Sequence, residues 1–192
     1  MSYKRKFKTR ELILCAFFAS LIAVGAFIRI PVPIVPFTLQ FLFVNLAGLL
    51  LGRRLGAVSV LVYILIGLLG LPVFSSGGGL GYVFHPTFGY LIGFCVGSYV
   101  AGYIVEKINM PEFKSYFMAS LANICIVYLF GVIYYYVIAN YYLNSSLAAG
   151  VLILHGVILC LPGDLLICFW SSLLAKRLRP FVFKGESLYV NK

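Results

Sequence analysis

Acidic side chains are scarce in this sequence of 192 residues, which has five Asp and Glu residues against 15 Lys and Arg residues. Four of the acids lie at the ends of long apolar stretches or between them: Glu11, Glu106, Glu112 and Glu186. Only Asp164 lies inside such a stretch. A pair of carboxylates that share a proton, as an aspartyl protease requires, is therefore excluded. A lone buried carboxyl group is costly, and such groups are usually kept for function.

Clustered metal ligands and phosphate-binding motifs are also missing. The five cysteines have no paired spacing, and the two histidines, His85 and His155, lie far apart. We therefore expect no disulfides, no metal site and no cofactor. The GGGLG run at 77–81 lacks the Lys-Ser/Thr ending of a nucleotide phosphate loop, so we expect no ATP hydrolysis by this chain. No serine nucleophile motif and no repeated channel filter is present. A binding protein that is not an enzyme is the remaining prediction.

Apolar residues make up 62% of the chain and charged residues 10%, with a mean hydropathy of +1.04. This composition is typical of an integral membrane protein. We predict an all-α fold with one domain over 1–192, a compact bundle of six transmembrane helices. The expected spans are 12–28, 38–51, 55–69, 86–105, 116–139 and 151–175.

The positive charge lies in every second connection between these spans. It occurs in a basic tail over 1–10, at Arg53 and Arg54, between the fourth and fifth spans, and near the tail over 180–192. The positive-inside rule therefore predicts that both termini are cytoplasmic and that the glycine-rich loop over 71–86 faces outward. We expect a multi-pass protein of the bacterial plasma membrane, in contact with lipids and not with nucleic acid.

The glycine-rich loop is the first candidate for a wall or lid of a binding site, because glycines let the backbone approach a ligand closely. A flexible hairpin without a ligand is the alternative. The residues expected to converge at the outer half of the bundle are Thr38, Gln40, Gly78, Gly79, Tyr82, Thr87, Tyr90 and Asp164. They suit a small, mostly apolar ligand with an N–H edge, such as a ureido or amide group, that faces the carboxylate.

Two features of the spans have both a structural and a functional interpretation. Asp164 follows Pro162 and Gly163, which should break the helix locally, and its carboxyl group either binds a ligand or satisfies a tyrosine of the bundle. Small residues recur in the first span, where Ala19 and Ala23 lie four residues apart. Such rows pack helices closely, either within the bundle or against a separate membrane subunit.

Three segments, PVPIVPFTLQ at 31–40, LPVFSSGGGLGYVFHPTFGYLIGF at 71–94 and LPGDLL at 161–166, resemble the BioY family. These are the biotin-specific S components of energy-coupling factor (ECF) vitamin transporters. The resemblance implies a six-helix subunit that captures biotin from outside and topples in the membrane when docked to a transmembrane T component and two ATPases. It also implies that Asp164 meets the ureido ring beneath the glycine-rich loop, with Ala19 and Ala23 on the docking face.

Two positions depart from the family pattern. Relatives often carry Lys one helical turn after the acid, where this chain has Ile167, and often read Pro-Thr-Gly-Gly-Tyr, where position 88 is Phe. The ligand's carboxylate then either meets Arg29, the sole cation near the outer side, or stays hydrated at the mouth. An S component for lipoate or a biotin precursor is therefore an alternative, and a structural membrane subunit without a ligand is another.

Overall fold

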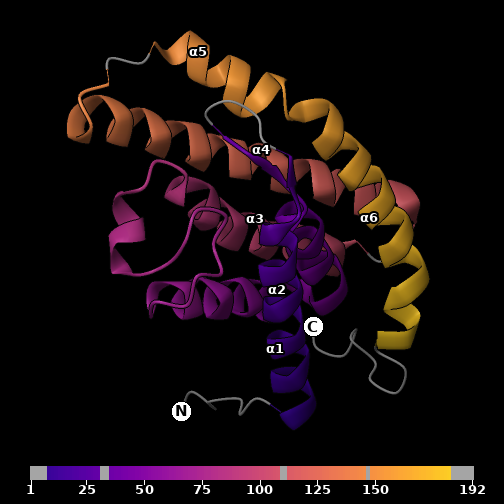
Figure 1. Cartoon of the computed structure of the whole chain (residues 1–192). Coiled ribbons are helices and arrows are strands. Elements are labelled where there is room, and N and C mark those ends of the chain that lie inside the picture. The colour runs from indigo at the N-terminus through magenta and orange to yellow at the C-terminus, as the bar shows by residue number, and fades with distance from the viewer. Residues whose placement is uncertain (1–7, 31–34, 109–111, 146–147, 183–192) are drawn as a thin grey trace, which may run out of the picture.

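A computed structural model describes residues 8–30, 35–108, 112–145 and 148–182. Its elements, in chain order, are α1 (Thr9–Phe27), β1 (Arg29–Ile30), β2 (Phe37–Thr38), α2 (Gln40–Leu68), the 3-10 helix η1 (Leu80–Phe84), α3 (Phe88–Lys107), α4 (Phe113–Val137), the π-helical η2 (Ile138–Tyr142), α5 (Ala149–Ile153), the π-helical η3 (Leu154–Ile158) and α6 (Leu161–Val182). Five helical segments within these ranges are long and apolar enough to cross a membrane. The fold is therefore that of an α-helical membrane protein (Figure 1).

The long helix α2 reverses its direction at Gly52. This residue has φ 82° and ψ −179°, a conformation that favours glycine. A Cβ atom built on Gly56 would lie 2.8 Å from the Cα of Gly48, although eight residues of straight helix span about 12 Å. The halves over 40–51 and 53–68 therefore run back along each other. The reversal lies in the connection that the sequence predicted between the spans over 38–51 and 55–69, which Arg53 and Arg54 also occupy.

The end of α3 packs against this turn. The side chain of Glu106 accepts a hydrogen bond from the backbone N–H of Arg53 at 2.9 Å and forms an ion pair with its guanidinium at 3.0 Å. A Cβ atom on Gly102 would lie 2.3 Å from the nitrogen of Arg53, so only glycine fits there. The ion pair is half exposed and adds little stability, so the backbone hydrogen bond and the close packing hold the turn.

The start of α1 and the end of α6 meet near the same end of the bundle. Arg10 donates to the backbone oxygen of Val182 at 2.5 Å, and the guanidinium of Arg179 lies 5.9 Å from the ring centre of Tyr116 in α4. A buried apolar cluster that includes Leu51 joins all these helices. We call this the turn end of the molecule. The described part of α1 begins at Thr9 and that of α6 continues to Val182, and the rest of the two expected tails, 1–7 and 183–192, lies outside the described residues.

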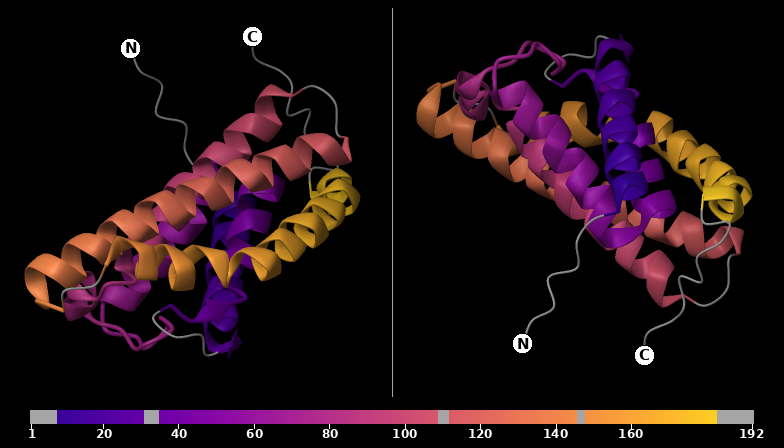
Figure 2. Two further views of the ribbon diagram at one scale, coloured as in Figure 1. Left: turned by 90° about the horizontal axis from the view of Figure 1, so that it is seen from above. Right: turned by 90° about the horizontal axis from the view of Figure 1, so that it is seen from below.

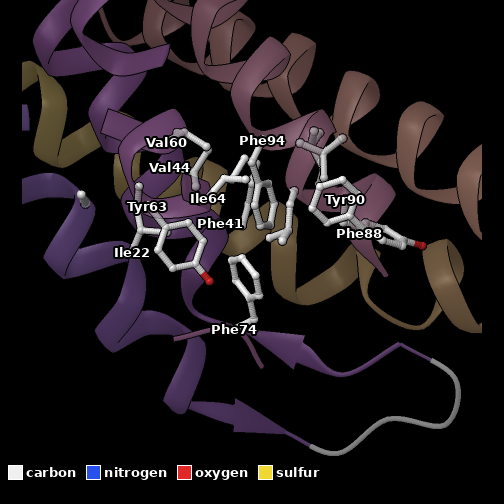
Figure 3. Packing of buried hydrophobic residues seen from close by; sticks show 14 of the residues in the cluster. Ile22, Phe41, Val44, Val60, Tyr63, Ile64, Phe74, Phe88, Tyr90 and Phe94 are labelled. Atoms are coloured by element: carbon white, nitrogen blue, oxygen red, sulfur yellow. The ribbon is translucent and has the colours of Figure 1, made fainter. Parts of the chain in front are cut away.

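The opposite end, called the ribbon end, carries the β1–β2 ribbon and the glycine-rich loop. The strands β1 and β2 pair antiparallel, and Pro31 and Pro33, which lie between them in the sequence, are outside the described residues. The loop is anchored by Phe74, whose ring is 2% exposed and lies 5.5 Å from Tyr63 and 4.5 Å from Tyr82. Figure 3 shows this ring pointing into the core. The loop is thus a packed element.

The last segment curves along α4 as α5, η3 and α6 (Figures 1 and 2). Its helix is irregular over 154–160, where η3 is followed by a two-residue turn. The local break expected beside Pro162 is therefore present in the turn that precedes this residue. Pro162 occupies the first turn of α6, where its missing N–H costs nothing. This bend brings Asp164 to the start of α6.

Candidate functional site

A cavity opens at the ribbon end, between the β-ribbon, the start of α2, the glycine-rich loop, α3, α4 and the last segment. Five of the predicted ligand-binding residues line it together: Thr38, Gln40, Thr87, Tyr90 and Asp164. Its apolar walls include Phe37, Phe41, Leu91, Phe94, Ile124 and Val127. Few polar groups converge on mostly apolar walls, which is the usual composition of a small-molecule site.

Asp164 is 7% exposed, and its Oδ2 accepts a hydrogen bond of 2.5 Å from the hydroxyl of Tyr128. Within the described ranges Oδ1 has no protein partner, and the residue lines the cavity. The carboxylate therefore satisfies a tyrosine and still presents an acceptor to a ligand. Tyr128, which also lines the cavity, was not predicted. Its position in the middle of a span, away from the tyrosines at 134–142, was the available signal.

A row of hydrogen bonds ties the start of α2 to the glycine-rich loop. The Thr38 hydroxyl donates to Gln40 Oε1 at 3.2 Å, and Gln40 Nε2 donates to the Tyr63 hydroxyl at 2.7 Å. Tyr63 in turn donates to the backbone oxygen of Val73 at 3.0 Å. These bonds fix the orientation of the Gln40 amide at the cavity wall.

The hydroxyls of Tyr90 and Thr87 are held by hydrogen bonds. The Tyr90 hydroxyl donates to the backbone oxygen of Gly156 in η3 at 3.3 Å, where a Cβ atom would lie 2.7 Å from that hydroxyl. The Thr87 hydroxyl lies 3.2 Å from the Tyr82 hydroxyl and 2.7 Å from Nδ1 of His85. Burial lowers the pKa of His85 below its ordinary value. The imidazole is therefore a neutral partner of Thr87 near pH 7.

Four predicted residues do not line the cavity. Gly78 and Gly79 pack the loop against the end of α2: a Cβ atom on Gly78 would lie 2.2 Å from the oxygen of Leu71, and the N–H of Gly79 donates to the oxygen of Gly67 at 2.7 Å. Tyr82 contacts two residues of the cavity lining, because its hydroxyl lies 3.2 Å from the Thr87 hydroxyl and 3.4 Å from the Ser75 hydroxyl. Arg29 donates to the backbone oxygen of Ser75, which itself lines the cavity.

A buried polar network lies toward the turn end from the cavity. Asn45 Nδ2 donates to Ser120 at 2.8 Å and to Ser171 at 2.7 Å, and Asn123 Nδ2 donates to Asn45 Oδ1 at 3.0 Å. Asn123 in α4 therefore hydrogen-bonds across the bundle to α2. Ile167, one of the two positions that depart from the expected family pattern, is 7% exposed and belongs to the apolar core.

The expected docking residues lie differently on α1. Ala19 is 4% exposed and belongs to the apolar core of the bundle, whereas Ala23 is half-buried against it. The exposed small residues are Ala16 and Ser20. The sequence could not separate these two rows because α1 is apolar on every side. The side chain of Ala19 therefore lies inside the bundle.

The described part of the chain has no group of three His, Cys, Asp or Glu side chains that could hold a metal ion. The chemistry of the cavity is therefore that of its hydroxyls, its amide and one carboxylate. Such groups bind and orient a ligand that brings N–H donors.

Comparison with known proteins gives matches over most of the chain. A family model described as "BioY family" matches residues 2–184. The "Probable biotin transporter BioY" of Lysinibacillus sphaericus is 48% identical over 170 residues, which cover 88% of this chain and 87% of that protein. The "Biotin transporter BioY" of Thermotoga maritima is 38% identical over 171 residues, 88% of this chain and 96% of that protein.

The fold also matches a solved structure. A crystal structure of "the S-component for biotin from an ECF-type ABC transporter" has a TM-score of 0.75 to this chain at 24% sequence identity. The match covers 91% of this chain and 95% of the other. At this identity the likeness concerns the fold.

Proposed function

The chain belongs to the BioY family, and we propose that it is a membrane-embedded S component that captures biotin from outside the cell for ATP-driven uptake. Its curated relatives carry the name of biotin transporters, and its fold is that of an S component. The observation that carries the proposal is the cavity, in which one carboxylate faces apolar walls beneath the glycine-rich loop.

The site suits both the polar ureido group and the apolar part of a bicyclic ring system. Oδ1 of Asp164 is an acceptor for a ureido N–H, and the apolar walls take the bicyclic part of biotin. Thr38, Gln40, Thr87 and Tyr90 complete the polar contacts. Gly78, Gly79 and Tyr82 contribute through the shape of the loop, which closes over the ligand.

We further propose six membrane crossings in one domain over 1–192, with the two halves of α2 as separate crossings. The reversal at Gly52 supports this count, and the bond between Arg10 and Val182 supports a common side for the two ends of the bundle. Since Arg53 and Lys107 also lie at the turn end, the positive-inside rule makes that end cytoplasmic, in the bacterial plasma membrane.

We propose that the ATP is hydrolysed by partners, a pair of ATPase subunits bound to a transmembrane T component. The small residues on the exposed side of α1, Ala16 and Ser20, with half-buried Ala23 at the edge, form the proposed docking face. Ala19 supports this face from inside the bundle.

Ligand titration tests the proposal. We expect purified protein in nanodiscs to bind biotin saturably, and Asp164→Asn to weaken that binding about tenfold or more, since hydrogen bonds to charged groups are worth roughly 1.5–3 kcal/mol. Glu112→Gln, which removes an exposed carboxylate far from the cavity, is the matched control. Unchanged affinity in Asp164→Asn would remove this residue from the site.

Two other outcomes favour the alternatives. Tighter binding of lipoate or desthiobiotin than of biotin would favour another small acid, an alternative motivated by Ile167 and Phe88. No binding of any of these ligands would favour a structural subunit, whose Asp164 serves only Tyr128.

A further inference from the structure

If the proposed function holds, the ligand brings a carboxylate that the cavity itself cannot neutralise. The one charged residue that lines the cavity is Asp164, an anion. Ile167 is buried in the apolar core and does not line the cavity. A carboxylate inside the cavity would therefore face a like charge, and it must lie at the mouth, next to a cation or in water.

Arg29 is the sole cation available there. The proposed outer connections, which follow α1, α2 and α4, contain no other Lys or Arg and no Asp or Glu. Within the described ranges Arg29 forms no ion pair. Its charge is therefore uncompensated at the ribbon end, in contrast to Arg53 at the turn end, which is paired with Glu106.

The β-ribbon directs Arg29 toward the cavity. Arg29 pairs with Thr38 across the antiparallel ladder. Residues directly opposite each other in such a ladder project from the same face, with Cβ atoms about 4.5–5.5 Å apart. Since Thr38 lines the cavity, the side chain of Arg29 leaves the ribbon on the same face as one residue of the cavity wall.

The other end of the Arg29 side chain is also placed at the cavity. Its Nη1 donates to the backbone oxygen of Ser75, a residue of the glycine-rich loop that lines the cavity. A guanidinium group has five N–H donors in a planar fork, and this bond uses one of them. The remaining donors can bind a carboxylate in the bidentate geometry that Arg favours.

We propose that Arg29 binds the ligand's carboxylate at the mouth of the cavity, between the β-ribbon and the glycine-rich loop, and thereby selects free acids over uncharged derivatives. Asp164 then binds the ureido end of the ligand, and Arg29 binds its carboxylate end. Because Arg29 also holds the loop through Ser75, the bound carboxylate joins the ribbon and the loop on the same guanidinium.

The test compares biotin with biotinamide, which keeps the ureido ring and lacks the negative charge. Dissociation constants are measured by calorimetry in nanodiscs for the natural protein, Arg29→Gln and Arg29→Lys. We expect Arg29→Gln to weaken biotin about tenfold or more and to leave biotinamide within about twofold, since only biotin loses charge-assisted bonds. Arg29→Lys should recover part of the biotin affinity, because it keeps the charge and loses the fork.

Two controls separate the causes. Arg54→Gln removes an exposed cation at the turn end and should change neither constant, whereas Asp164→Asn should weaken both ligands alike. If Arg29→Gln weakens the binding of biotin and biotinamide equally, Arg29 serves only to hold the loop through Ser75. If it weakens neither, the ligand's carboxylate is hydrated. Either result overturns the inference. A natural protein that binds neither ligand would instead overturn the proposed function itself.

Discussion

The hydroxyl of Tyr128 tests whether Asp164 serves the ligand or the bundle. Tyr128→Phe removes one hydrogen bond of 2.5 Å to the carboxylate and changes no ring volume. A hydrogen bond to a charged group is worth roughly 1.5–3 kcal/mol. If Tyr128 orients the carboxylate for a ureido N–H, the loss of this hydrogen bond weakens the free energy of biotin binding. At about 1.4 kcal/mol per factor of ten, we expect the biotin dissociation constant to rise about ten- to hundredfold.

A double-mutant cycle makes this expectation specific. Calorimetry in nanodiscs gives the biotin affinity of Tyr128→Phe, Asp164→Asn and the double variant. Because both residues act through one contact, the tyrosine change should have little further effect in the Asp164→Asn background. Tyr141→Phe, at a side chain that is 80% exposed, is the control and should bind biotin normally.

The opposite result is equally clear. If Tyr128→Phe lowers the melting temperature and leaves the biotin affinity unchanged, the carboxylate exists to satisfy the tyrosine. Additive losses in the double variant would show that the two side chains contact the ligand independently. Either result would refute the view that Tyr128 positions Asp164.

Two further predictions concern the loop and the docking face. Phe74→Ala removes the buried anchor of the glycine-rich loop, and such a change costs about 3–5 kcal/mol in a core. We therefore expect biotin to dissociate at least tenfold faster from this variant in stopped-flow chase experiments. Leu80→Ala, at a side chain that is 75% exposed, is the control and should leave the dissociation rate unchanged. Equal rates in the two variants would show that Phe74 does not hold the loop closed. Ala16→Leu, on the proposed docking face, should abolish biotin uptake by cells and leave the biotin affinity unchanged. Ala19→Leu overpacks the core and should instead lower the melting temperature. Normal uptake in Ala16→Leu would place the docking face elsewhere.

The sequence predicted the helical spans because apolar runs separated by proline, glycine or cations have few alternatives in a membrane. It predicted the connection between residues 51 and 55, where Arg53 and Arg54 lie, although only the conformation of Gly52 locates the reversal within it. It also predicted a local break of the last segment beside Pro162, and the irregular stretch of that segment ends just before this proline.

The inward faces of the helices were harder to predict, for a physical reason. In a soluble helix the polar face marks the outside, whereas in α1 the lipid-facing and core-facing sides are both apolar, so Ala19 and Ala16 look equivalent in sequence. The contact of Tyr128 with Asp164 joins residues 36 positions apart, and no local pattern encodes it. Polar residues inside spans are the exception to this difficulty. A polar group such as that of Asn123 or Asp164 is costly to bury without a hydrogen bond, so its side chain is expected to face the bundle.

The two ends of the molecule divide binding into a fixed and a closing part. Toward the turn end, Asn45 bonds to α4 and α6 at once, in a network of fully buried groups that cannot open without leaving polar atoms unpaired in an apolar environment. At the ribbon end, the loop is held by two buried rings, Phe74 and Tyr82, and by single hydrogen bonds such as that from Tyr63 to Val73. Ligand binding can therefore order the loop at modest cost while the helices beneath keep Asp164 in place, because affinity depends on how little must be ordered on binding.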